Sequence, residues 1–514
     1  MTASISIEDI HKLINDGNLD DAAHICTLGI EQTGDAEFTY LLSVIRAQQN
    51  QFEEAIKLCE DAIQKLPDRA DVTYTLGVIY FSANNLERAI VAWQRTNEIN
   101  PDHQDALFNT AAGLSQLGRD TESQQLYEQL LEANPKNEMA LYNYANLKVR
   151  MQSPEMALPL FQRLLDVNPD FEAGWVNYGL AAQRTGDLDN AKIYFNKALL
   201  INTESVEAHW NLAHLLLIQG HWREGFAEYE WRLKRPEAPK PDWSQPAWDG
   251  KPADAGCDQT LLLWIDQGVG DAIQFLRYAR FAAEHVNTII LRCQPSLVNL
   301  AKTTPGIDTV ISIDDPLPAF DVHAPLMSLA HLLDQTEPSG TWQAPYFSGV
   351  SGHNDFSLDA PKNSKKIGLV WAGNPAHRND AHRSCSLGTL QPLLQNSDAT
   401  FFSLQVGPGR EAELFSPLFS SIIDLAPRLN DFSDTAAAIQ SLDLVISVDT
   451  AVAHLAGALG KPTWLMLPGI DPDWRWLLEQ TNTDWYPSLR LFRQAVPGDW
   501  TGVIADMASV LKDL

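Results

Sequence analysis

The sequence has few cysteines and few basic residues, and it lacks long apolar runs. Its five cysteines are scattered, without a C-x-x-C pair or a histidine-rich metal spacing, so a reduced cytoplasmic protein is expected. No run of about 18 apolar residues occurs, and the first residues lack the basic-then-apolar order of a signal peptide. We therefore expect neither secretion nor membrane insertion, and no bound metal.

The charge balance is acidic throughout. The chain has 37 Lys and Arg residues against 66 Asp and Glu residues, a net charge of −29. The excess is divided evenly between residues 1–240 (net −15) and 241–514 (net −14). Such an anionic field repels nucleic acid and acidic membrane surfaces. Any phosphate site must therefore be a local basic pocket.

A repeat with a period of 34 residues runs through the first half of the chain. Its clearest marker is a proline at constant spacing, at Pro67, Pro101, Pro135 and Pro169. In the same frame a small residue recurs at Ala55, Ala89, Ser123, Ala157, Ala191 and Gly225. Four positions later an aromatic residue recurs at Trp93, Tyr127, Phe161, Phe195 and Tyr229. A further small residue recurs at Gly77, Ala111, Ala145, Gly179 and Ala213. Each repeat therefore places small and large side chains on faces that pack together.

This pattern strongly resembles the tetratricopeptide family over residues 36 to about 235, with a weaker unit before it. The resemblance implies an α-solenoid over residues 1–235, in which helix pairs stack into a superhelix with a long concave surface. Surfaces of this kind bind extended peptides. We expect residues 236–256, rich in proline and tryptophan, to be the linker that follows.

One polar position recurs within the repeats. Asparagine holds it in four successive units, at Asn109, Asn143, Asn177 and Asn211. A carboxamide offers one acceptor and two donors, so this ladder could pair with the backbone of a peptide whatever its side chains. It resembles the acceptor groove of the eukaryotic O-linked N-acetylglucosamine transferase. The alternative is that asparagine is simply common at this position of the repeat.

The second half alternates apolar strand-like runs with helical patterns, which predicts parallel sheets. One series begins with TLLLWID, and a second begins with KIGLVWAG after the polar stretch 348–366. We expect two Rossmann-like subdomains, at 257–350 on the acceptor side and 365–514 on the donor side. This is the GT-B arrangement of nucleotide-sugar transferases.

The segment WIDQGVGDAIQFLRYARF predicts a strand, a glycine loop and a helix. Gly268 and Gly270 would let the backbone approach a ligand, but Ile273 replaces the third glycine of a dinucleotide fingerprint, so no such cofactor is expected. The run resembles the glycine–aspartate loop of the ADP-heptose lipopolysaccharide heptosyltransferases. That resemblance implies that Asp271 is the general base. The alternative is that Asp271 only caps a helix.

The run LDLVISVDTAVAHLAGALGKPTWLML closely resembles the donor-site motif of the same family. Free amide groups of Thr450, Ala451 and Val452 at a helix N-terminus would suit a pyrophosphate. Asp449 could accept hydrogen bonds from donor sugar hydroxyls, and His454 lies one turn further along. The alternative is a well-capped βα unit with a core histidine.

The run KIGLVWAGNPAHRNDAHRS supplies the local basic pocket that the overall charge requires. Its place matches the donor-phosphate loop of the heptosyltransferases, which implies donor contacts for Asn374, Arg378 and Arg383. That family has a lysine in this loop and this chain has none, so which arginine replaces it stays open. Gln405 and the aromatic run PDWRW, with Trp474, Arg475 and Trp476, are expected to line the cleft.

Together these features resemble bacterial fusions of tetratricopeptide repeats to a transferase, a group that includes enzymes that glycosylate flagellin. The resemblance implies an inverting, metal-independent glycosyltransferase with a protein acceptor such as flagellin and no cofactor besides its nucleotide-sugar substrate. ADP-heptose, UDP-N-acetylhexosamine and a CMP-linked nonulosonic acid all stay open as donors. The competing hypothesis is a catalytically inactive repeat scaffold for protein partners.

Overall fold

The computed structural model describes residues 6–254, 256–341, 345–347, 350, 352, 356–377, 379–395 and 398–512. The chain forms two compact units, Met1–Ile201 and Asn202–Leu514. None of the helices in these described ranges is long and apolar enough to cross a membrane.

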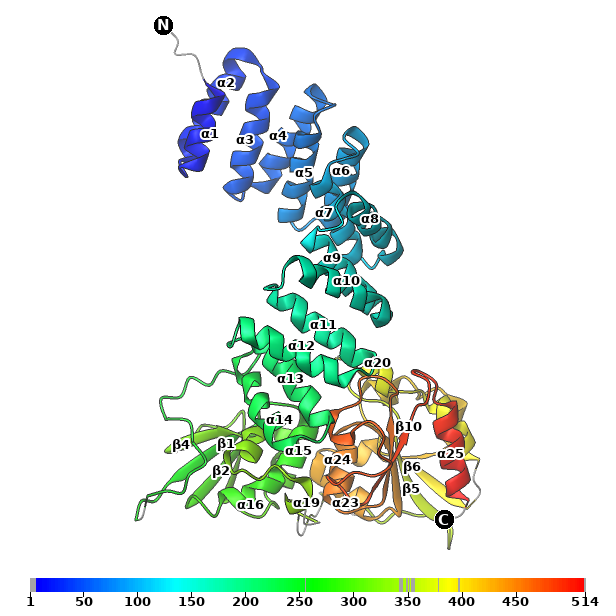
Figure 1. Ribbon diagram of the computed structural model, residues 1–514. Coiled ribbons are helices and arrows are strands. Elements are labelled where there is room, and N and C mark those ends of the chain that lie inside the picture. The colour runs from blue at the N-terminus through cyan, green and yellow to red at the C-terminus, as the bar shows by residue number, and fades with distance from the viewer. Residues whose placement is uncertain are drawn as a thin grey trace. The chain divides into compact units, whose positions relative to one another are not determined.

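The first unit is a stack of helix pairs (Figure 1). Its helices are α1 (Ile7–Asn15), α2 (Leu19–Thr33), α3 (Ala36–Gln48), α4 (Phe52–Lys65), α5 (Ala70–Ser82), α6 (Leu86–Ile99), α7 (Gln104–Gln116), α8 (Asp120–Ala133), α9 (Glu138–Arg150), α10 (Pro154–Val167), α11 (Glu172–Arg184) and α12 (Leu188–Ile201). Each helix contacts the next along the chain, as expected for a solenoid.

The small and large residues of the repeat pack on one another. A Cβ atom placed on Gly77 of α5 would lie 2.3 Å from the Trp93 indole nitrogen of α6. One placed on Gly179 of α11 would lie 2.5 Å from the Phe195 ring of α12. The small residue therefore makes room for the aromatic ring of its partner helix, which is the physical reason for the predicted pattern.

The second unit begins with one more helix pair and continues into two sheets. Its helices are α13 (Val206–Ile218), α14 (Trp222–Tyr229), α15 (Val269–Phe275), α16 (Ala279–Ala282), α17 (Val298–Ala301), α18 (Leu329–Leu332), α19 (Pro338–Thr341), α20 (Asp380–Arg383), α21 (Gln391–Leu394), α22 (Pro408–Glu411), α23 (Phe432–Gln440), α24 (Ala451–Ala458) and α25 (Thr501–Leu511). Short 3-10 helices that matter below are η1 (Glu230–Lys234), η4 (Leu326–Ser328) and η8 (Trp474–Trp476).

The strands of the second unit form two sheets, and every pair of neighbouring strands is parallel. One sheet has the order β3-β2-β1-β4, and the other has the order β10-β9-β8-β5-β6-β7. The strands are β1 (Thr260–Trp264), β2 (Thr288–Cys293), β3 (Thr309–Ser312), β4 (Val322–Pro325), β5 (Lys365–Val370), β6 (Ala399–Ser403), β7 (Ile423–Asp424), β8 (Leu444–Val448), β9 (Thr463–Leu467) and β10 (Leu489–Arg493). This arrangement confirms the predicted solenoid followed by a GT-B fold.

The two sheets meet through helices α15 and α24, which lie between them and contact each other (Figure 1). Gly270 of α15 allows this contact, because a Cβ atom there would lie 2.9 Å from the ring of His454 on α24. The two halves of the GT-B fold therefore touch at the helices that follow β1 and β8.

The division between compact units differs from the predicted end of the repeats. The repeat sequence extends to about residue 235, but the units divide after Ile201. The reason is packing: Phe226 of α14 lies against Phe275 and Trp474, at 5.9 Å and 5.6 Å between ring centroids. By its contacts, the last helix pair is part of the second unit. The expected linker also pairs with the first sheet, since Trp248 N–H donates to the His323 carbonyl at 2.8 Å.

Candidate functional site

Each sheet of the second unit has a point where the order of its strands reverses. In the first sheet β2 and β3 extend to one side of β1 and β4 lies on the other. In the second sheet β6 and β7 extend to one side of β5, while β8, β9 and β10 extend to the other. Loops diverge at such points and leave a crevice at the carboxyl ends of the strands, where ligands bind in open α/β sheets. We therefore expect ligand crevices at the two strand reversals, the first crevice at β1/β4 and the second crevice at β5/β8.

Asp271 follows β1 at the first crevice, on the opening turn of α15. Its Oδ2 atom accepts a hydrogen bond from the Gly268 N–H at 3.0 Å, and its Oδ1 atom accepts one from Arg475 Nη2. The capping role is therefore real, but it uses only one carboxylate oxygen. The Asp271 side chain is 26 % exposed, so a substrate can still reach it.

Arg475 comes from η8 in the other half and connects three acidic or amide groups. Besides Asp271 it donates to Gln274 of α15, and its Nη1 atom lies 2.9 Å from both oxygens of Asp473. Its side chain is 2 % exposed and its guanidinium lies 4.1 Å from the centroid of the Trp474 ring. A buried charge needs such partners to be tolerated. Arg475 thus fixes the position of Asp271 across the boundary between the halves.

These contacts set the protonation of the acids. Burial raises the pKa of Asp271 above its usual value; the Asp473 and Asp266 charges also raise it, while Arg475 opposes the rise. For Asp473, burial would raise the pKa, but Arg475 holds it below its ordinary value. Burial, together with the Asp473 charge, raises the pKa of Asp449 to about 6. The site therefore contains carboxyl groups of different basicity, as acid–base chemistry requires.

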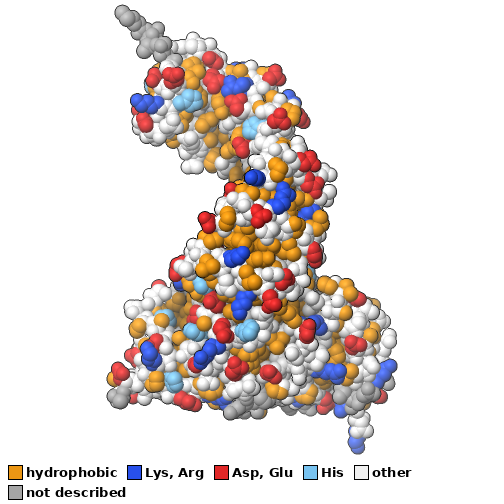
Figure 2. All heavy atoms as spheres, viewed as in Figure 1, with side chains coloured by type: hydrophobic (Ala, Val, Ile, Leu, Met, Phe, Trp, Pro, Cys, Tyr) orange, Lys and Arg blue, Asp and Glu red, His pale blue; other side chains and the backbone are white. Residues whose placement is uncertain are grey.

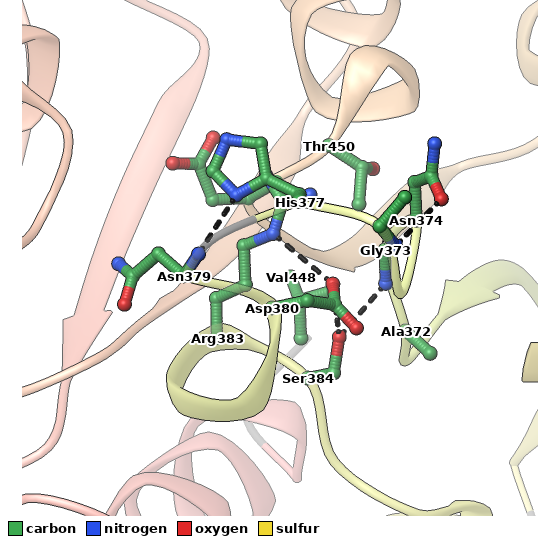
Figure 3. Close-up of polar contacts among 12 residues, drawn as sticks. Ala372, Gly373, Asn374, His377, Asn379, Asp380, Arg383, Ser384, Val448 and Thr450 are labelled. Atoms are coloured by element: carbon green, nitrogen blue, oxygen red, sulfur yellow. Dashed lines mark hydrogen bonds and ion pairs between the residues drawn. The ribbon is translucent and has the colours of Figure 1, made fainter. Parts of the chain in front are cut away.

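The loop after β5 lies at the second crevice and is folded around Arg383 (Figure 3). Arg383 Nη1 donates to the backbone carbonyl of Asp449 at 2.9 Å, and its Nε lies 3.3 Å from Asp380 Oδ1. Gly373 N–H donates to Ser384 Oγ at 2.9 Å, and Ser384 donates to Asp380 at 2.9 Å. A Cβ atom on Gly373 would lie 2.7 Å from Arg383 Nη2, so glycine is needed for this approach.

The strand β8 ends directly before Asp449, and α24 begins with Thr450 as its N-cap. The first amide groups of a helix have no partner inside it, so those of Ala451 and Val452 can bind an anion. Arg383 brings its positive charge to the same place through its bond to Asp449. The second crevice thus combines a guanidinium with a helix N-terminus.

Three other predicted donor residues have structural partners. Gln405 Oε1 accepts from the N–H groups of Trp371 and Ala372 at 3.0 Å and 2.9 Å, so it fixes the end of β5. Asn374 Oδ1 accepts from the Ala376 N–H at 3.0 Å within its own exposed loop. Buried His454 lies 3.1 Å from the Tyr486 hydroxyl through Nδ1, and burial lowers its pKa to about 3. A direct role of these side chains in donor binding stays a prediction. Arg378 lies outside the described residues.

The glycines of the first loop differ in their surroundings. Gly270 lies against His454 and Ala451, so packing of α24 on α15 explains its missing side chain. Gly268 is exposed, and its N–H holds Asp271. Gly268 therefore acts on the site through Asp271, and close approach of a ligand to either glycine stays a prediction.

The asparagine ladder is partly engaged within the solenoid. Asn109 donates to the Tyr74 hydroxyl at 3.1 Å, and Asn177 donates to the Tyr142 hydroxyl and to Asn146 Oδ1, each at 2.9 Å. Asn211, in the second unit, donates to the Glu207 carbonyl at 2.8 Å. Asn143 is half-buried. The amide donors of three ladder members thus have partners, and peptide binding by the ladder stays a prediction.

A surface pocket of about 300 Å³ lies beside Asn109. Its lining is mostly apolar and consists of Tyr74, Val78, Phe81, Leu86, Trp93, Asn109, Ala112, Gly113 and Gln116. Phe81 and Val78 are 50 % and 38 % exposed. Apolar side chains are also visible between charged ones on the face of the first unit in Figure 2. The solenoid therefore offers a partner apolar contact area next to one carboxamide.

The structure adds residues that the sequence did not single out. Asp473, beside Arg475, is one of them, and the run PDWRW held the only sequence signal for it. Others come from the last repeat: burial raises the pKa of Tyr229 and the charge of Asp271 adds to the rise, while Asp473 and Arg475 act on the pKa of His214, which burial lowers to about 4. Nothing in the repeat pattern distinguishes these two side chains from ordinary repeat residues. Within the described ranges no cluster of His, Cys, Asp and Glu is arranged to hold a metal ion.

Comparison with known families gives matches in both units. Residues 46–113 and 173–204 match tetratricopeptide repeats, and residues 409–464 match glycosyltransferase family 9 (heptosyltransferase). The chain therefore joins N-terminal tetratricopeptide repeats to a glycosyltransferase family 9 domain. This confirms the resemblance that the motifs predicted.

Individual proteins are more distant. Protein FlbA of Caulobacter vibrioides is 24% identical over 343 residues, which is 59% of this chain and 54% of that protein. The chain thus spans about half the length of this curated relative. Among solved structures, the C-terminal part of a repeat protein from Cytophaga hutchinsonii is 15% identical, with a TM-score of 0.40 over 46% of this chain and 97% of that chain. A repeat protein from Parabacteroides merdae is 17% identical, with a TM-score of 0.36 over 44% and 89%.

Proposed function

We propose that this chain, which joins tetratricopeptide repeats to a glycosyltransferase family 9 domain, transfers a sugar from a nucleotide-activated donor to a protein bound by its repeats. The observation that carries the proposal is the position of Asp271. It lies at the crevice of the first sheet, keeps part of its surface exposed and is held by an arginine from the opposite half. A carboxylate so placed can take the proton of an acceptor hydroxyl as that oxygen attacks the anomeric carbon.

Burial makes Asp271 a stronger base than an ordinary aspartate, since it raises the pKa of this carboxyl group. Its two existing hydrogen bonds do not prevent the reaction, because each carboxylate oxygen has two lone pairs. Attack from the side of Asp271 on a donor held in the opposite half inverts the anomeric centre. The placement of Asp271 and the proposed donor site on opposite halves supports an inverting mechanism.

The second crevice is the proposed donor site. Arg383 and the amide groups of Ala451 and Val452 would hold the diphosphate, and they supply positive charge to the leaving group without a metal ion. Asp449, at the end of β8, would accept hydrogen bonds from sugar hydroxyls. Gln405 supports the site by fixing the backbone at the end of β5.

The proposed acceptor is a polypeptide in the groove of the solenoid, with flagellin as the first candidate. Support comes from the apolar pocket beside Asn109 and from the recurrence of asparagine in successive repeats. The pocket would take an apolar side chain of the acceptor, while carboxamides pair with its backbone.

An inactive scaffold is the second candidate. The observation that favours it is that both oxygens of Asp271 already have hydrogen-bond donors, and that the loop after β5 has no lysine. In that case the solenoid would bind partners and the transferase domain would catalyse nothing.

A transfer assay separates the two. The full chain is titrated with ADP-heptose, UDP-N-acetylhexosamine and a CMP-linked nonulosonic acid, and then incubated with flagellin and each donor that binds. A transferase should bind at least one donor and increase the intact mass of the acceptor by one sugar. Binding of no donor in this panel, with no mass change, would favour the scaffold.

A further inference from the structure

The crevice of the first sheet is filled by a side chain from the last repeat. Arg232 of η1 extends to the carboxyl ends of β1 and β4, where its Nε lies 2.7 Å from Asp266 Oδ2 and its Nη2 lies 2.8 Å from Ser328 Oγ. Asp266 follows β1, and Ser328 lies in η4 directly after β4. Both the Arg232 and the Asp266 side chains are 1 % exposed.

The contacts of Arg232 form a closed network. Its Nη1 donates to Glu230 Oε1 at 2.6 Å and to the Tyr229 carbonyl at 3.2 Å, and Ser328 Oγ donates to Glu230 Oε2 at 2.8 Å. In the described part of the chain, Asp266 Oδ1 has no hydrogen-bond partner. Arg232 is therefore the group that compensates the buried charge of Asp266.

The network ends five residues before the proposed base. Asp266 begins the turn that leads through Gly268 to Asp271, and Gly268 N–H is itself bonded to Asp271 Oδ2. Tyr229, whose carbonyl Arg232 holds, belongs to the same last repeat, and burial raises its pKa with a further contribution from the Asp271 charge. A shift of Arg232 would therefore be passed to Asp271 through a chain of bonded groups.

We propose that Arg232 is a positioning residue for Asp271, and that the last repeat (residues 206–234) is in this way a built-in part of the acceptor side of the transferase. The inference rests on the proposed function, because it assigns to Arg232 the support of the proposed base. The forked shape of the guanidinium is essential, because it binds Asp266, Ser328 and Glu230 at the same time. The ammonium group of a lysine, on its flexible stem, makes such a set of contacts less well.

Kinetics of full-length variants give the first test. Arg232→Met should lower kcat by roughly 10- to 100-fold, the scale for a displaced catalytic group, without changing the Kd of the nucleotide diphosphate. Arg232→Lys should restore part of the loss. Because Arg232→Met leaves a buried carboxylate without its counter-charge, Asp266→Asn is the second variant: it removes that carboxylate while Arg232 keeps Glu230 and Ser328.

The pH profile distinguishes an effect of this network on Asp271 from a general effect on the packing of the domain. The charged and titratable groups that interact with Asp271 are Arg475, Asp473 and His377 from the other half, Asp266 from its own loop and Tyr229 from α14. The negative charge of Asp266 raises the pKa of Asp271, so Asp266→Asn should move the acidic limb of the rate profile to lower pH. A loss of packing alone would lower the activity at every pH and leave the limb in place.

The matched control is Arg223→Lys together with Arg223→Met. Arg223 lies in the same repeat and pairs with Asp334, but these side chains are 69% and 62% exposed. Both control variants should keep the wild-type kcat and pH profile. Wild-type behaviour of Arg232→Lys and Asp266→Asn as well would overturn the proposal.

A second readout does not depend on transfer. The carboxyl carbon resonances of labelled aspartates report the titration of each group directly. The Asp271 resonance is identified as the one that is lost in Asp271→Asn. Asp271 should titrate at lower pH in Asp266→Asn than in the wild type, and an unchanged titration would contradict the proposal. If the wild type transfers no sugar, the proposed function fails, while this titration still decides whether the network acts on Asp271.

Discussion

The two sheets of the second unit have the same kind of strand reversal but differ in the side chains that lie there. At β1/β4 the crevice is filled by Arg232, and its buried charge is matched by Asp266 and Glu230. At β5/β8 an arginine is also present, but Arg383 is 14 % exposed and binds a backbone carbonyl as well as an acid. The Arg232 side chain is thus buried against acids of the protein, whereas part of the Arg383 side chain is exposed.

This difference separates two tasks that any transferase must combine. A filled crevice gives a rigid support on which a base can be held in one position. A crevice with a helix N-terminus and a partly exposed guanidinium can bind and release a diphosphate. Under the proposed function, the proton transfer therefore belongs to the first sheet and the leaving group to the second.

The strongest test of this division is removal of the charge on Asp271. We expect Asp271→Asn to lower kcat by roughly 100-fold or more, as loss of a general base should, with little change in fold or in donor Kd. Steady-state kinetics and calorimetric titration measure the two quantities. The exposed Asp314→Asn in the same half is the control and should behave like the wild type. Full activity of Asp271→Asn would exclude this residue as the base.

Removing the guanidinium from the second crevice should affect binding instead. Arg383→Ala should weaken nucleotide-diphosphate binding by about 1.5–3 kcal/mol, the value of a hydrogen bond to a charged group. Calorimetric titration measures the loss. Arg410→Ala serves as the control, because Arg410 lies in the same half but pairs with Asp424 at 2.7 Å beside the edge strand β7. Equal affinities of the Arg383 variant and the wild type would place the phosphate site elsewhere.

The pH dependence of turnover should be set by the titration of Asp271, which lies at the first crevice. Asp271 must be ionised to accept a proton, and burial raises its pKa, so kcat/KM should fall on acidification at a pH above the usual aspartate pKa of about 3.9. The rate rises with pH through this pKa and is lost below it. A profile measured over the acidic range, with protein stability followed in parallel, checks the position of the limb. A limb at the pKa of an exposed aspartate would show that burial does not tune this group.

The smallest expected effect lies outside both crevices. Replacing Asn143, Asn177 and Asn211 together by alanine should raise the KM for a protein acceptor while leaving the donor Kd unchanged. Each net hydrogen bond contributes only about 0.5–1.5 kcal/mol, so the triple variant is needed. An unchanged KM would mean that the ladder only stabilises the repeats and that the acceptor is recognised in the transferase domain.

Much of the fold could be predicted because its signals are local. The apolar runs TLLLWID, NTIILRC and DTVISID predicted β1, β2 and β3, and the runs KIGLVWAG, FFSLQVG, SIIDLAP, LDLVISVD and PTWLMLP predicted β5 to β9. The period of 34 residues predicted the helix pairs. Strands β4 and β10 were not predicted. The first is four residues long and ends in proline, and the second, LRLFR, has arginine at two of its five positions and follows an irregular segment. Their pairing with β1 and β9 is what makes them strands.

The site was less predictable, because its decisive contacts join distant residues. The motifs predicted Asp271, Arg383 and the start of α24, each of which follows a recognisable strand. The pairs Asp271–Arg475 and Arg232–Asp266 connect residues 204 and 34 positions apart, and no periodicity indicates them. The same holds for the bond of Asn177 to Tyr142, 35 residues earlier, which only the stacking of one repeat on the next creates.

The place where the compact units divide, after Ile201, has a consequence for how the chain can change in length. A repeat protein gains or loses whole modules without disturbing the rest, since each module touches only its neighbours. Here the module of α13 and α14 is excluded from that freedom, because Phe226 and Arg232 are built into the transferase core. Insertion or deletion of whole modules upstream of Ile201 should therefore change the length of the repeat array by one module at a time. The terminal module would stay in place as its fixed end.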